Sequence, residues 1–201
     1  MPPLAAARGA TLVHSRVLTL AFLRPAPGED RMNDLTARAS QHGMCHAELV
    51  FDGGMGFSIY YEEPTRIRRR TFSNPGYEMV TLSVPHMEYS ACSQFCAQAA
   101  KEAYPFDSWG MYLATIHPGD CSHRPSSAVG KTFCSKIITE ALQFAGAPEV
   151  GGLSPSAVTP SRLYAAVKDS ERRVCHAVRP MQLSKGRGQG GSGLVAQMTM
   201  R

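Results

Sequence analysis

The chain has 201 residues, of which 43% are hydrophobic and 18% charged, and its formal net charge is +5. This is the composition of an ordinary globular protein and excludes wholesale disorder. No apolar run approaches the roughly 18 residues that a transmembrane helix needs, so we expect no membrane span. The segment before Glu29 contains arginines and no acidic residue, but no small-residue cleavage site follows its apolar part. We therefore interpret it as part of the protein rather than as a targeting peptide.

The first half of the chain predicts an antiparallel sheet interrupted by one short helix. Residues 11–23 form an apolar strand pattern that ends at prolines, and residues 31–42 have helical spacing with Gly43 at the C-cap position. Residues 44–51 and 56–62 flank an Asp-Gly-Gly turn, which predicts a hairpin. Residues 78–84 alternate between apolar and polar positions and predict a further strand.

The second half predicts helices. Apolar stripes run through residues 88–103 and 131–145, and a loop rich in Gly, Ser and Pro over 147–158 leads to a last helix that begins near Pro160. Residues 174–182 fit one more short strand. The expected fold class is therefore α+β, with an antiparallel sheet or half-barrel packed against helices.

The domain pattern is an N-terminal extension over 1–10, one domain over 11–180 and a Gly-rich, flexible tail over 181–201, which can serve as a docking segment for protein assembly. The arginine cluster at 66–70 is interpreted as a solvated strand or loop. Such a run could also meet phosphate groups on nucleic acid or lipid. Because no aromatic residues are interleaved with these arginines, we favour the solvated strand or loop over nucleic-acid binding.

The six cysteines lack the spacing of a disulfide framework, which favours free thiols in a reducing, cytoplasmic compartment. Cys134 lies at the predicted start of the helix over 131–145, where the helix dipole and unpaired backbone amides favour a thiolate and could hold an oxyanion. Cys92 and Cys96 lie in the middle of an apolar helical stripe and are expected to be packing residues. Cys134 is therefore the candidate nucleophile.

His46 is the candidate base. On a strand of period two it shares a face with Glu48, whereas Ala47, Leu49 and Phe51 form the more apolar face. An imidazole on the less apolar side of a strand, next to a tight hairpin, is suited to line a cleft.

Two motifs occur in a fixed order, CHAELVFDGG at 45–54 and TFCSKIITEALQFAG at 132–146. Together they resemble the paired signatures of permuted papain-like cysteine amidohydrolases, the superfamily of NlpC-type peptidases and lecithin:retinol acyltransferase relatives. In the permuted branch a strand histidine precedes a cysteine that opens a later helix, and this chain has that order. The resemblance covers about residues 11–168, and the pattern is especially similar to versions from large DNA viruses.

The resemblance implies a permuted papain-like fold and a thiol hydrolase or acyltransferase that acts through a Cys134/His46 acyl-enzyme on an amide, ester or thioester, without a cofactor or metal. It also implies a third, imidazole-orienting group. Ser58 falls nearest the expected position, with Glu48 as a same-strand substitute, although a serine supplies no charge to stabilise imidazolium. A viral origin would place the protein in the host cytoplasm or the virion.

Two alternatives stay open. The domain could be catalytically weak or inactive and serve as a structural or binding component, for example of a virion. It could also be a zinc module that uses Cys92, Cys96, Cys121 and His123, although structural zinc sites rarely take paired ligands from an apolar helical stripe. The substrate, whether peptide, lipid or another acyl compound, is not specified by any sequence pattern.

Overall fold

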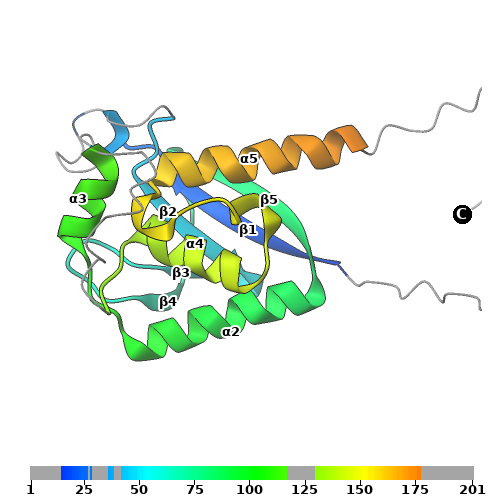
Figure 1. Cartoon of the computed structure of the whole chain (residues 1–201), viewed down its shortest axis with the longest axis horizontal. Coiled ribbons are helices and arrows are strands. Elements are labelled where there is room, and N and C mark those ends of the chain that lie inside the picture. The colour runs from blue at the N-terminus through cyan, green and yellow to red at the C-terminus, as the bar shows by residue number, and fades with distance from the viewer. Residues whose placement is uncertain (1–14, 27, 29–35, 39–41, 117–129, 178–201) are drawn as a thin grey trace, which may run out of the picture.

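A computed structural model describes residues 15–26, 28, 36–38, 42–116 and 130–177, with side chains as far as residue 170. These residues form an α+β structure in which a five-stranded antiparallel sheet packs against helices (Figure 1). The coarse fold class expected from the sequence is therefore confirmed. A search of the described helices finds none with the length and apolarity of a membrane span.

The sheet has the strand order β4-β3-β2-β1-β5, and each neighbouring pair is antiparallel. The strands are β1 (Ser15–Leu23), β2 (His46–Phe51), β3 (Met55–Ser58), β4 (Arg66–Arg69) and β5 (Tyr77–Pro85). The predicted hairpin is present as β2 and β3, joined by the short 3-10 helix η1 (Asp52–Gly54). Gly53 and Gly54 both have a φ of 72°, a conformation that favours glycine and explains the Asp-Gly-Gly sequence.

The longer α-helices of the described residues are α2 (His86–Glu102), α3 (Ser108–Ile116), α4 (Cys134–Phe144) and α5 (Pro160–Ala177). Short 3-10 helices η2 (Pro148–Val150) and η3 (Pro155–Ala157) lie in the Gly- and Pro-rich segment. Of the helix predicted over 31–42, residues 36–38 are helical and 31–35 and 39–41 lie outside the described residues. The strand predicted over 174–182 is wrong at its beginning, because α5 continues through Ala177.

The sequence did not predict α3 or β4 as regular elements. Helix α3 begins after Asp107, whose carboxylate accepts a hydrogen bond of 2.9 Å from the Gly110 amide, as an N-cap does. A Cβ added at Gly110 would lie 2.4 Å from that carboxylate, so any larger residue there would force the Asp107 side chain to shift. Strand β4 forms from the arginine cluster because it pairs with β3, which places Arg68 opposite Gly56.

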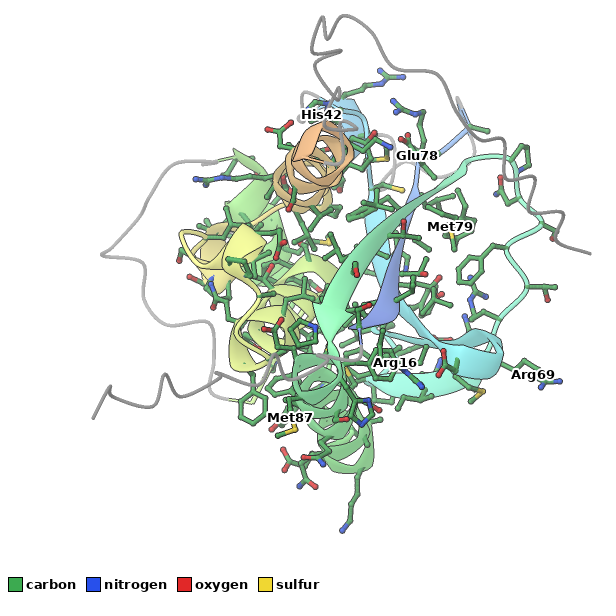
Figure 2. The ribbon with its side chains drawn as sticks, turned by 90° about the vertical axis from the view of Figure 1, so that its right-hand side faces the viewer. Arg16, His42, Arg69, Glu78, Met79 and Met87 are labelled. Atoms are coloured by element: carbon green, nitrogen blue, oxygen red, sulfur yellow. The ribbon has the colours of Figure 1, made fainter. Side chains whose placement is uncertain are left out.

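The two faces of the sheet have different roles. Leu20, Leu49 and Val80 are buried on one face and pack with Ile138 and Leu142 of α4. Burial of each such side chain contributes on the order of 1.5–3 kcal/mol. The alternate residues of the same strands lie on the other face, which Figure 2 shows with Met79 on the side away from the helices. In the β1 and β5 region this second face is exposed, with Val17 58% and Met79 40% accessible.

Candidate functional site

The start of α4 holds Cys134 in a fixed position. Phe133 is the extended N-cap residue, and α4 begins at Cys134, three residues after the first residue of the helix predicted over 131–145. The preceding residue, Thr132, is tied by its backbone to the 105–107 segment: Asp107 N–H donates to its carbonyl at 2.7 Å, and its own N–H donates to the Pro105 carbonyl at 3.0 Å. The Ser135 hydroxyl donates to the Val158 carbonyl at 2.8 Å. The hydrogen bonds of Thr132 and Ser135 therefore fix the start of α4, which carries the Cys134 sulfur.

The environment of the Cys134 thiol combines burial with backbone donors. The residue is 4% exposed, and burial raises the pKa of the thiol to about 11. Hydrogen bonding from the backbone of Ala47, Ser135 and Cys134 itself favours the thiolate but does not outweigh burial, and the charge of Glu48 raises the pKa further. The helix start therefore does not produce the low thiol pKa that its position alone would suggest, and the group is a neutral thiol at pH 7.

His46 is the first residue of β2 and is nearly buried, with 9% of its surface exposed. Its ring packs against the ring of Tyr60 at a centroid distance of 4.5 Å. Burial is the main cause that lowers the imidazole pKa to about 4. The negative charge of Glu48 raises this pKa but does not compensate, because the positive charges of Arg70 and Arg68 lower it further. The imidazole is therefore neutral at pH 7, and its buried Nε2 has no hydrogen-bond partner among the described residues.

A polar network lies beside His46 on the second face of the sheet. Glu48 is 1% exposed, and its carboxylate accepts hydrogen bonds from Arg70 Nε at 3.1 Å and Arg70 Nη2 at 2.9 Å. The hydroxyls of Tyr60 and Tyr77 also donate to Glu48 Oε1. Burial and the neighbouring carboxylate raise the pKa of both phenols, that of Tyr77 to about 12.

The two candidates for the orienting group occupy different positions. Glu48 Oε1 lies 3.7 Å from His46 Nε2, so the structure brings this carboxylate to the imidazole. The Ser58 hydroxyl donates instead to the main-chain carbonyl of Ala47 at 2.7 Å. Since a hydroxyl has one proton, that of Ser58 is directed to the strand backbone. Of the two, Glu48 is the one with a charge placed to act on His46.

Cys134 and His46 line the same cleft, whose volume is about 470 Å³. The other lining residues are mostly apolar or aromatic. They come from the end of β1, residues 36–38, the residue before β2, the 59–63 segment after β3, and the 106–111 segment: Leu23, Thr36, Cys45, Ile59, Tyr60, Tyr61, Glu63, Phe106 and Met111. This combination of an apolar wall and a few polar groups is typical of a small-molecule or peptide-chain site. The structure thus brings two sequence-distant stretches to one cavity.

Sequence reasoning did not assign a site role to Arg70, Tyr77, Phe106 or Met111. The Arg70 and Tyr77 contacts with Glu48 span 22 and 29 residues, so no local spacing reveals them. The available signal was Glu48, which together with His46 is polar on a strand whose other residues are apolar.

Cys45, Cys92, Cys96 and Cys134 are free thiols in the structure. Within the described part of the chain, no group of three or more His, Cys, Asp or Glu side chains is arranged to hold a metal ion. Cys92 and Cys96 are buried in α2, and the other ligands of the zinc hypothesis, Cys121 and His123, lie outside the described residues.

Comparison with known proteins gives no relative: no family model, no curated protein and no solved structure matches this chain.

Proposed function

We propose that the protein is a thiol hydrolase or acyltransferase in which Cys134 is the nucleophile and His46 its general base, on a permuted papain-like fold. The observation that supports the proposal is that these two side chains line one cleft, one from the start of α4 and the other from the start of β2. Covalent acyl transfer needs a nucleophile and a general base that act at the same substrate carbonyl, and a shared cleft meets the first condition for this.

The reaction begins from two neutral groups. The imidazole of His46 removes the thiol proton as the sulfur of Cys134 attacks the carbonyl carbon of an amide, ester or thioester. The resulting oxyanion lies near the backbone donors of Ala47, Ser135 and Cys134. The imidazolium then protonates the leaving group, which leaves an acyl-enzyme, and water or an acceptor attacks that thioester with His46 again as base.

Glu48 completes the proposal as the positioning residue for His46. Its negative charge lies 3.7 Å from Nε2 and stabilises the imidazolium formed during attack. Arg70 and the two tyrosine hydroxyls hold the carboxylate in place. The low imidazole pKa predicts that activity rises as pH increases through about 4 and then remains level across neutral pH.

The experiment is acylation by p-nitrophenyl acetate followed by intact-mass and peptide mass spectrometry. We expect one acetyl group on Cys134 in the wild type, none there in Cys134→Ser, and slower acylation at pH 7 in His46→Gln. Cys45→Ser is the matched control, because Cys45 is a second thiol of the same cleft; it is expected to acylate normally. Acetylation on cysteines other than Cys134, or none at all, would remove the proposed nucleophile.

A domain without turnover is the second candidate, and the deep burial of the thiol favours it. Cys134 is 4% exposed and its pKa is raised to about 11, so the nucleophile is not preformed. This candidate predicts that Cys134 is never acylated at neutral pH although the protein is folded. The acylation experiment therefore distinguishes the two functions directly.

A further inference from the structure

Two aromatic rings that touch each other form part of the wall of the cleft. Tyr61 and Phe106 both line it, and their ring centroids lie 5.4 Å apart in an edge-to-face arrangement. They come from different parts of the chain, since Tyr61 follows β3 and Phe106 precedes α3. Ile59 and Met111 also line the cleft and extend the apolar surface beside the two rings.

The position of Phe106 is tied to that of the nucleophile. Phe106 forms a parallel bridge with Thr132, which lies two residues before Cys134. The half-buried Phe106 ring also packs against the main apolar cluster. The backbone segment that leads to the thiol therefore also holds this wall of the cleft in place.

The charges of the cleft wall are nearly balanced. Among the described residues that line the cleft, none is Lys or Arg, and Glu63 is the one acidic side chain. Glu63 pairs with Arg66, which offsets its charge. The lining therefore offers no cation to bind a carboxylate and no unpaired carboxylate to bind an amine.

The volume of the cleft, about 470 Å³, limits the size of the group that it holds. It lies in the lower half of the range of about 300–1,000 Å³ that is typical of small-molecule pockets. An acetyl group would leave most of this space empty, whereas a long acyl tail would extend beyond it.

We propose that the cleft is a pocket for an uncharged, apolar acyl group of medium length, with Tyr61, Phe106 and Met111 as its specificity-determining residues. The proposal rests on the proposed function and names the substrate class for it. An acyl chain that contacts these walls leaves water, and each buried methylene is expected to strengthen binding roughly fourfold.

The test uses p-nitrophenyl esters with acyl chains from acetate to decanoate. In each, the Cys134 sulfur forms a thioester with the acyl carbon, the ester C–O bond breaks, p-nitrophenolate leaves and the thiol proton goes to His46. The measured quantity is the rate constant of Cys134 acylation divided by that of N-acetylcysteine with the same ester. We expect this ratio to rise roughly fourfold per methylene up to hexanoate and then to level off.

Variants of the aromatic pair should reduce this dependence on chain length. Phe106→Ala removes one ring, and Tyr61→Ser removes the other from a residue that is 54% exposed, so the second variant does not threaten the core. Phe95→Ala is the matched control, because Phe95 is a half-buried ring paired with Phe144 at 5.5 Å and is not among the lining residues. It should keep the dependence of the wild type. The same dependence in all three variants would contradict a role of the aromatic pair.

A second measurement does not require acylation. Hexanamide should shift the NMR signal of the Met111 methyl group, assigned with Met111→Leu. Adipamate and 5-aminopentanamide, which have the same four-methylene chain ending in a carboxylate or an ammonium group, should not.

The two measurements separate the pocket from the proposed function. If hexanamide shifts the Met111 signal while no ester acylates Cys134, the proposed function fails and the apolar pocket stands. If acylation does not depend on chain length and hexanamide leaves Met111 unchanged, the pocket is wrong. A larger shift with 5-aminopentanamide than with hexanamide would mean that Glu63 selects a cation, and the uncharged class would be wrong.

Discussion

The two faces of the sheet differ in what they bury and therefore in what they can do. On the helix-covered face Leu49 is buried among mostly apolar side chains, which supply stability, and the thiol of Cys134 lies at the border of this cluster. On the other face, at the β2 end, Glu48 and His46 are almost as well buried, but among tyrosines and arginines. The comparison teaches that burial alone does not define the core, because the same strand provides the core with one set of alternate residues and the candidate site with the other.

The largest effect is expected on the apolar face. Leu49→Ala removes a fully buried side chain between the sheet and α4. We expect the free energy of unfolding to fall by about 4 kcal/mol, because lost transfer energy and an unfilled cavity add. Urea denaturation at pH 7 measures this change. A decrease below about 1 kcal/mol would mean that this face does not form the tightly packed core.

The next effect comes from His46 and depends on pH. Its folded-state pKa is about 4, below the unfolded value of 6.5, so the unfolded chain binds more protons between these values. The contribution of His46 is therefore complete above pH 6.5 and is lost as pH falls toward 4, by about 3 kcal/mol. We expect the stability difference between wild type and His46→Gln to shrink by this amount between pH 7 and pH 4. Parallel stability curves for the two proteins would contradict the low pKa.

Breaking the ion pair of the second face should cost less than the core substitution. Glu48→Gln leaves Arg70 without its carboxylate, and we expect a loss of about 2 kcal/mol, since the Arg70 side chain is 20% exposed and can be partly hydrated. The double variant with Arg70→Gln should cost clearly less than the sum of the two single changes. Additive losses in this denaturation cycle would show that the pair is not coupled.

The smallest effect is expected where the second face is open to solvent. Val17 is 58% exposed on β1, so Val17→Thr, which keeps a β-branched side chain, should change stability by less than about 0.5 kcal/mol. The same urea experiment measures it. A loss above about 1 kcal/mol would indicate that this region of the second face is covered in solution.

Local patterns predicted much of the fold. The period-two residues of β1, β2 and β5, the Asp-Gly-Gly turn and the presence of Cys134 in the first turn of a helix agree with the sequence interpretation, because each depends on neighbours within a few residues. Helix α3 was missed because its signal was a single Asp107 cap beside a glycine, and β4 because its arginines carry no strand pattern.

The sequence by itself determined that a cysteine lies near the start of a helix and a histidine near the start of a strand. It therefore showed that a thiol and an imidazole could serve as nucleophile and base. Only the tertiary structure decided that they share one cleft, that both are buried in neutral form, and that Glu48 rather than Ser58 carries a charge close to the imidazole. The physical reason is that desolvation and ion pairing depend on groups such as Arg70, far from His46 along the chain, whereas turns and helix starts are set by adjacent residues.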